Sequence, residues 1–202
     1  MCCWRRYSAL FSLFSSKFPN DFSFRPFTLQ EVLRRKGYLQ NTLAVITADH
    51  GESLGEHGLY THANSVREEA LNVPLILIPV GYAASANTSD RTFPAQVDIA
   101  PTVLGELGVP APATWKGRAL NSETGLPLMY FEEHAFAGLI DHRDATHAWK
   151  YWIDRNSGVD HVFDLSVDPH ETLDVRGAIP ATLLAQLRDL SRTGPSAGLA
   201  VR

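Results

Sequence analysis

The chain has 202 residues, of which 45% are apolar and 20% charged, and its formal net charge is −4. This length suffices for a sizeable hydrophobic core and indicates one domain, or one domain with a small appendage. The lack of a basic excess argues against a nucleic-acid-binding protein. The two cysteines, Cys2 and Cys3, are neighbours, so they offer neither a disulfide framework nor a cysteine zinc site.

Residues 1–27 differ from the rest of the chain, because they are rich in aromatic residues and serine. The basic start and short apolar run resemble a signal peptide, but a poor one. Serines interrupt the run, and no clear small-residue cleavage site follows it. The run is too short to span a bilayer. We therefore expect an irregular or unrelated amino-terminal segment and no transmembrane segment, and we leave the localisation open.

The first regular pattern is an amphipathic helix followed by a strand. Thr28 and Glu31 have the spacing of a capping box, and the helix they begin is expected to stop at Gly37. Residues 43–48 are continuously apolar and rich in β-branched side chains. Such a run is expected of a central parallel strand that is covered on both faces.

Three further elements follow in the middle of the chain. A helix or turn is expected over residues 64–71, before a second strand over residues 73–80. The prolines of that strand favour a position near a sheet edge or end. Residues 98–108 predict a helix, with Asp98 as the capping acceptor, a proline in the first turn and a glycine at the end.

The carboxy-terminal third predicts a small antiparallel sheet and a closing helix. Its short aromatic and β-branched pieces alternate and are separated by turns. The expected strands cover residues 128–132, 148–153 and 161–165. The Leu-rich stretch 179–190 predicts an amphipathic helix, and residues 193–202 read as a tail.

Ionisable side chains begin directly after the strand 43–48. Asp49 and His50 stand at its end and Gly51 follows, which permits a sharp turn. Ligands of open α/β sheets collect at strand ends, and carboxylate oxygen and imidazole nitrogen both bind divalent cations. The pair is therefore a candidate half of a metal site. The alternative is a strand-ending turn with a hydrogen-bonded histidine.

The polar cluster continues through a stretch punctuated by glycines, and its members are Glu52, Glu56, His57 and His62. Loops that carry several ionisable groups are frequent sites of function. His62 can donate a hydrogen bond or a positive charge to an anionic substrate oxygen, as sulfuryl and phosphoryl transfer require. The alternative for His57 and His62 is a solvated loop histidine.

Residues 47–62 read Thr-Ala-Asp-His-Gly-Glu-Ser-Leu-Gly-Glu-His-Gly-Leu-Tyr-Thr-His and resemble the second metal-ligand motif of the sulfatase family, within the alkaline phosphatase superfamily. The resemblance covers about residues 29–190 and continues, in family order, through residues 68–77, 97–104, 115–120 and 162–172. It implies a partial alkaline-phosphatase-like α/β/α sandwich with two or three parallel strands over residues 28–125. A small antiparallel sheet subdomain over residues 126–192 follows.

The resemblance also implies roles for the cluster. Asp49 and His50 would be ligands of one divalent metal ion, while His62 would be catalytic and, with His57, would contact a small-molecule sulfate or phosphate ester. Sulfatases generally hold calcium, whereas relatives with an Asp-His pair often use manganese or zinc. Many sulfatases have lysine near position 62. In having a histidine there, this sequence is similar to phosphoethanolamine transferases.

Two parts of the sulfatase pattern do not occur in the sequence. One is the adjacent Asp-Asp pair of metal ligands, and the other is the Cys or Ser, any, Pro, any, Arg motif whose first residue becomes the formylglycine nucleophile. Covalent catalysis needs a positioned nucleophile. We therefore predict a fragment of a metal-dependent hydrolase of sulfuric esters that is inactive alone.

Two alternatives stay open. The chain can instead be a phosphoethanolamine or phosphoglycerol transferase-like or phosphoester hydrolase relative, or it can be a non-catalytic remnant. Residues 98–104 and 168–172 are more typical of soluble sulfatases, and the sequence contains no transmembrane helix. These features favour the sulfatase.

Overall fold

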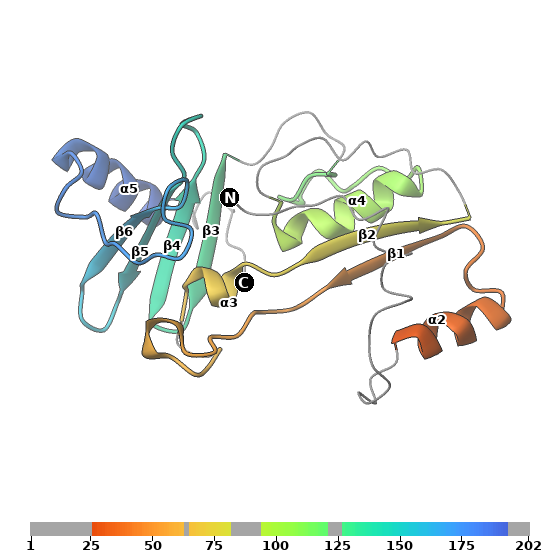
Figure 1. Ribbon diagram of the computed structural model, residues 1–202. Coiled ribbons are helices and arrows are strands. Elements are labelled where there is room, and N and C mark those ends of the chain that lie inside the picture. The colour runs from red at the N-terminus through yellow and green to blue at the C-terminus, as the bar shows by residue number, and fades with distance from the viewer. Residues whose placement is uncertain (1–25, 63–64, 82–93, 121–126, 194–202) are drawn as a thin grey trace. The chain divides into compact units, whose positions relative to one another are not determined.

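The structure is a computed structural model that describes residues 26–62, 65–81, 94–120 and 127–193, with side chains from residue 31 onward (Figure 1). These residues divide into two compact units. The smaller unit comprises residues 26–48 and 74–81, and the larger one comprises the remainder. None of the helices in these ranges has the length and apolar character needed to cross a bilayer.

The smaller unit contains a pair of strands, β1 (Thr42–Thr47) and β2 (Leu75–Val80). They are antiparallel, with Thr42 opposite Val80 and Thr47 opposite Leu75, so the predicted parallel direction is wrong for these two strands. Neither strand contains a buried residue, so the cover predicted for both faces of residues 43–48 is not found in the described part of the chain. An apolar β-branched run indicates a strand but not the direction of its neighbour.

The helix of this unit is α2 (Pro26–Arg35). It begins before Thr28, so the capping box predicted there is wrong. Its end is as predicted, because Gly37 has φ +74° and the Tyr38 amide donates to the carbonyl of Leu33 at 2.9 Å. A left-handed glycine followed by this hydrogen bond is a Schellman C-cap, which needs glycine because a Cβ disfavours the left-handed region.

The larger unit begins with short helical pieces and one longer helix. They are η1 (Glu56–Gly58), α3 (Glu68–Leu71), η2 (Gln96–Asp98) and α4 (Ile99–Glu106). The helix or turn expected over residues 64–71 is present as the single turn α3, and residue 64 lies outside the described residues. The helix expected over residues 98–108 is confirmed as α4.

Asp98 has a different role from the predicted helix cap. Its buried carboxylate accepts hydrogen bonds from the backbone amides of Arg118, at 2.7 Å, and Ala95, at 3.0 Å. The Thr102 hydroxyl donates to the Asp98 carbonyl and accepts from the Leu120 amide. Asp98 therefore fastens the segments on either side of α4 instead of satisfying the helix amides.

The rest of the larger unit is an antiparallel sheet and a helix, as predicted, but the sheet has four strands instead of the three expected. The elements are β3 (Leu128–Glu133), β4 (Phe136–Asp141), β5 (Trp149–Asp154), β6 (Asp160–Asp164) and α5 (Ala181–Thr193). The strands pair in chain order. The sequence pattern did not predict β4, because Gly138 weakens strand propensity. In the structure a Cβ on Gly138 would lie 2.1 Å from the carbonyl oxygen of Tyr151, so close strand pairing requires the glycine.

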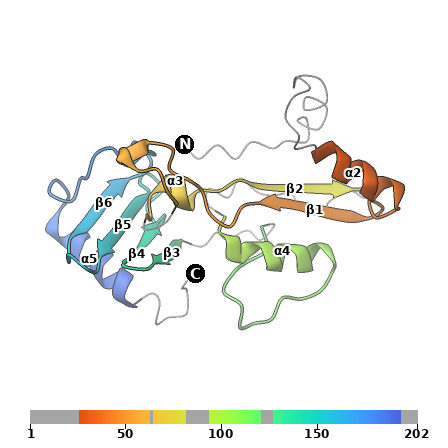
Figure 2. The same cartoon turned by 90° about the horizontal axis from the view of Figure 1, so that it is seen from below.

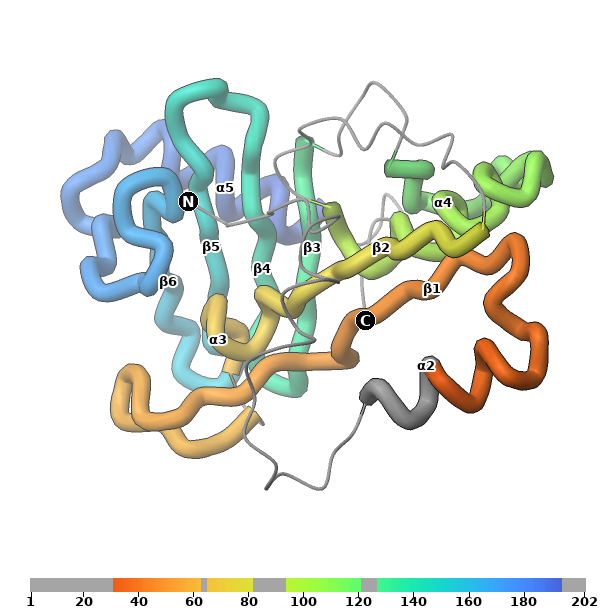
Figure 3. The backbone as a smooth tube through the Cα atoms, turned by 45° about the vertical axis from the view of Figure 1, so that its right-hand side comes forward, coloured from red at the N-terminus to blue at the C-terminus, as the bar shows by residue number. Residues whose placement is uncertain are grey.

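The two faces of this sheet carry separate cores, because successive side chains of a strand point to opposite faces. The face toward α5 buries Tyr130, Leu139, Tyr151, Val162 and Leu187. The other face buries Ile140, Trp152 and Phe163 with Val66, from the segment that leads into α3. Figures 2 and 3 show α3 and α5 on opposite faces of the sheet. The sheet is thus the support on which the α3 segment rests.

Candidate metal site

The loop of residues 49–62 is attached to α3 through Gly51. The Gly51 amide donates a hydrogen bond to the carbonyl of Ala70 at 2.8 Å. A Cβ on Gly51 would lie 2.0 Å from the Glu69 carbonyl oxygen, closer than any side chain tolerates. Gly51 does not lie in the left-handed region. Glycine is therefore needed here for the close approach of α3, and not for the sharp turn that the sequence suggested.

The tip of the loop folds back on itself. The Gly55 amide donates to the Leu59 carbonyl at 2.8 Å, and nearer the base the Ser53 amide donates to the Thr61 carbonyl at 3.2 Å. His57 has φ +53°, which is uncommon for a residue other than glycine. These bonds bring both ends of the loop together, so residues near its start face residues near its end.

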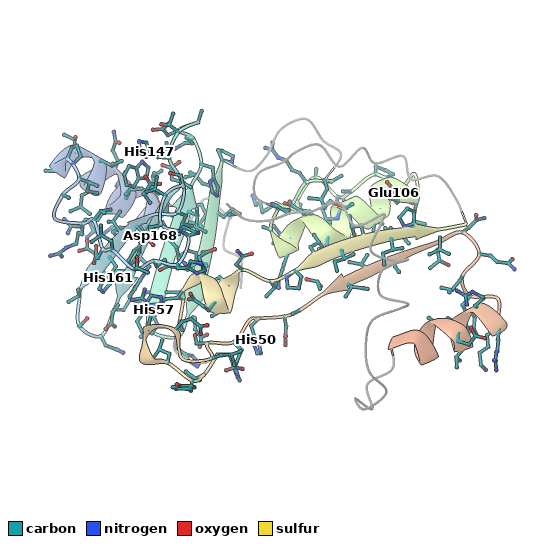
Figure 4. The ribbon with its side chains drawn as sticks, viewed as in Figure 1. His50, His57, Glu106, His147, His161 and Asp168 are labelled. Atoms are coloured by element: carbon teal, nitrogen blue, oxygen red, sulfur yellow. The ribbon has the colours of Figure 1, made fainter. Side chains whose placement is uncertain are left out.

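Asp49 and His50 present a carboxylate oxygen and an imidazole nitrogen at the start of the loop. Figure 4 shows the position of His50. The Nδ1 atom of His50 is 2.9 Å from the Gly51 carbonyl oxygen. A neutral imidazole therefore donates Nδ1–H to this carbonyl and leaves the lone pair on Nε2. His50 Nε2 lies 3.7 Å from Asp49 Oδ2, a separation that suits two ligands about 2.0–2.6 Å from one cation.

Hydrogen bonds favour the charged forms of both side chains. The His50 amide donates to Asp49 Oδ1 at 3.0 Å, and this bond is the main cause of the lowered pKa of Asp49. The Gly51 carbonyl is the main cause of the raised pKa of His50, and the Asp49 and Glu52 carboxylates act in the same direction. Asp49 is therefore an anion at neutral pH, and a cation must displace the proton of His50.

His62 lies beside this pair, while its predicted contact with the substrate stays a prediction. Its ring stacks on the ring of His50, with 4.4 Å between centroids and 22° between planes. Its Nδ1 is 2.9 Å from Oε2 of Glu52. A carboxylate that accepts Nδ1–H fixes the ring and turns Nε2 outward. Asp49, His50 and His62 thus form one cluster, with Glu52 as a support that sequence reasoning had only counted among its charged neighbours.

His57 lies apart from His50 and faces α3 (Figure 4). Its side chain is 19% exposed, and Nε2 is 3.8 Å from Oε1 of Glu69. Its role in substrate binding stays a prediction. Sequence reasoning also missed Gln96, whose Nε2 donates to the backbone carbonyl of Asp49 at 3.0 Å. No local pattern signals a contact between residues so far apart in the chain.

The part of the chain that the structure describes holds no group of three or more His, Cys, Asp or Glu side chains placed to bind a metal ion. Asp49 and His50 fit a divalent cation in ligand type and separation, but they supply only two ligands. A complete site needs further donors, since four to eight ligands are usual for zinc or calcium.

Comparison with known proteins points to a family, because the family model described as Sulfatase matches residues 28–109. This match and the relatives found support membership of the chain in the sulfatase family. Arylsulfatase K of Canis lupus familiaris is 30% identical over 169 residues, which cover 73% of this chain and 30% of that sulfatase. The chain therefore spans about a third of the length of its curated relative.

Solved sulfatase structures confirm the fold. A putative sulfatase from Bacteroides thetaiotaomicron has a TM-score of 0.58 and 24% identity, and the match covers 75% of this chain and 35% of that one. A 2-O GAG sulfatase has a TM-score of 0.61 and 22% identity, over 78% of this chain and 37% of that one. The partial α/β fold with its antiparallel subdomain is thus that of sulfatases, a family that generally uses a divalent metal.

Proposed function

We propose that Asp49 and His50 are two ligands of the divalent cation of a sulfatase-type hydrolase of sulfuric esters. The observation that carries the proposal is the 3.7 Å separation of Asp49 Oδ2 and His50 Nε2, with the other ring nitrogen of His50 held by the Gly51 carbonyl. When bound, such a cation would polarise the ester and offset the charge that develops on its oxygens. The family membership of the chain supports this assignment.

His62 is proposed to contact the anionic group of a small-molecule sulfate or phosphate ester. The Glu52 carboxylate accepts Nδ1–H, so an imidazolium at His62 presents Nε2–H to an oxygen of the substrate. The stacking of its ring on the ring of His50 supports this assignment. A charge-assisted donor of this kind stabilises an oxyanion more strongly than a neutral one.

The 202 residues by themselves are proposed to have little or no hydrolytic activity. They contain neither an adjacent Asp-Asp pair nor the formylglycine motif, so they supply no nucleophile of the family's type. With two ligands, a cation is also held weakly. We expect no hydrolysis of an aryl sulfate by this chain above the rate of an Asp49→Ala, His50→Ala variant.

Isothermal titration with calcium, manganese and zinc tests the metal site. A matched control is the Glu133→Ala, His134→Ala variant. These two residues are likewise adjacent in sequence, and His134 Nε2 lies 3.5 Å from Glu133 Oε1, close to the 3.7 Å of the Asp49–His50 pair. Binding should disappear in the Asp49→Ala, His50→Ala variant and persist in the control. Equal binding in both variants, or none in the native chain, would refute the proposal, and the preferred ion would identify the metal.

Anion binding separates the sulfatase from the phosphoester alternative. Sulfate and phosphate are titrated into the chain in the presence of the preferred metal, with His62→Ala as the variant. Sulfate bound in preference to phosphate, and lost in the variant, supports the sulfatase. Preference for phosphate would favour a phosphoester hydrolase or transferase relative instead.

A further inference from the structure

A cluster of buried charges lies on the face of the sheet that supports α3. Lys150 of β5 is fully buried, and its Nζ is 2.9 Å from Oε1 of Glu68 and 2.5 Å from Oε1 of Glu171. The side chain of Glu171 is also fully buried. We call Arg67, Glu68, Lys150 and Glu171 the Lys150 cluster. Removing charges from water is costly, so such a group persists only where its members are paired.

Glu171 joins this cluster to the backbone of α3. Its Oε1 accepts a hydrogen bond from the Glu68 amide at 2.8 Å, at the first residue of the helix. Its carbonyl accepts a hydrogen bond from the Arg67 guanidinium at 3.1 Å. Glu171 itself has φ +51°, a conformation that costs energy for a residue other than glycine. The surrounding contacts thus hold Glu171 in a strained conformation, in which its carboxylate accepts the hydrogen bond from the first residue of α3.

The opposite end of α3 holds the proposed metal ligands. The Ala70 carbonyl accepts the hydrogen bond from the Gly51 amide, and Gly51 directly follows His50. The Gly51 carbonyl in turn fixes the ring of His50. A continuous series of contacts therefore runs from Lys150 and Glu171, through the single turn of α3, to the nitrogen proposed to bind the cation.

We propose that Lys150 and Glu171 are positioning residues for the Asp49–His50 pair. They fix the position of α3, whose Ala70 carbonyl accepts the hydrogen bond from the Gly51 amide. They do not themselves bind the cation. This inference rests on the proposed function for its effect on metal binding, whereas the placement of Gly51 is independent of metal. A short helix of four residues has little stability of its own, so its position depends on such tertiary contacts.

The test compares the Glu171→Gln and Lys150→Met variants with Asp160→Asn in the full chain. Asp160 is a matched control, because it is also a buried carboxylate of the four-stranded sheet that pairs with two basic side chains, Arg176 and Arg188. Unlike those of Glu171, its contacts lie on the face of the sheet toward α5. Glu171→Gln keeps the side-chain volume and serves if Lys150→Met does not fold. Hydrogen exchange of the Gly51 amide is measured without metal, and ion affinity is then measured by titration.

Exchange at Gly51 should be at least about tenfold faster in Glu171→Gln than in Asp160→Asn at equal global stability, because a hydrogen bond to a charged group at the start of α3 is weakened. Ion affinity should fall by about 10- to 100-fold, as is typical when support of a ligand is removed. Unchanged exchange and unchanged affinity in Glu171→Gln would overturn the positioning role. Faster exchange in a chain whose native form binds no ion would support the positioning of Gly51 and refute the metal site instead.

Discussion

Replacement of Gly51 by alanine tests the contact on which the loop geometry depends. The new Cβ would lie 2.0 Å from the carbonyl oxygen and 3.0 Å from the carbonyl carbon of Glu69, and 3.4 Å from the Cα atom of Ala70. All three are backbone atoms, so no side-chain rotation relieves the overlap. The loop and α3 must therefore move apart, and the hydrogen bond from Gly51 to Ala70 is lost with the movement.

The expected loss is about 2–4 kcal/mol in the free energy of unfolding of the larger unit, from overpacking and one broken hydrogen bond. Gly177→Ala is the matched control, since a Cβ at Gly177 meets no heavy atom within 4 Å. That variant should change stability by less than about 1 kcal/mol. Urea unfolding followed by tryptophan fluorescence gives both values, because Trp149 and Trp152 lie in the sheet. A Gly51→Ala variant as stable as Gly177→Ala would refute the close approach of α3.

Two further predictions concern pH. Burial alone would raise the pKa of Asp160, but hydrogen bonds from Arg188 and Arg176 lower it to about 2. Its contribution of about 1–2 kcal/mol should therefore be present above pH 4 and be lost as the pH falls toward 2. In Asp160→Asn, acid unfolding curves should lack this loss. The hydrogen bond to Asp164 raises the pKa of His147, so this pair should stabilise the fold fully below pH 6.5 and less as the pH rises through the raised value. Unfolding of His147→Gln at pH 6 and pH 8 should show no such difference.

Local patterns predicted the elements whose geometry is decided by neighbouring residues. The helix stop at Gly37 follows from the conformational freedom of glycine, and α4 and α5 follow from apolar periodicity and terminal signals. The strands of the small sheet followed from alternation, except β4. The predicted boundaries at residues 27, 125 and 192 stay predictions.

Features that depend on distant residues escaped the sequence. The antiparallel direction of β1 and β2 depends on the path of the connecting segment, which an apolar run does not encode. Asp98 has the pattern of a helix cap, but the amide that it binds most closely belongs to Arg118. The sequence pattern of the strand over residues 148–153 gives no sign that Lys150 is buried, and the positions of Glu68 and Glu171 explain its burial.

The motif of residues 47–62 is contiguous in sequence, but its geometry is not locally determined. Its ligand-bearing end is held through α3, and α3 is held by Glu171, which follows Glu68 by 103 residues. Bringing these two residues together closes a long loop and therefore costs conformational entropy. The contacts within the four-stranded sheet are between neighbouring strands and can form earlier. The Asp49–His50 pair is therefore expected to reach its metal-binding geometry only after the sheet has formed and α3 has packed on it.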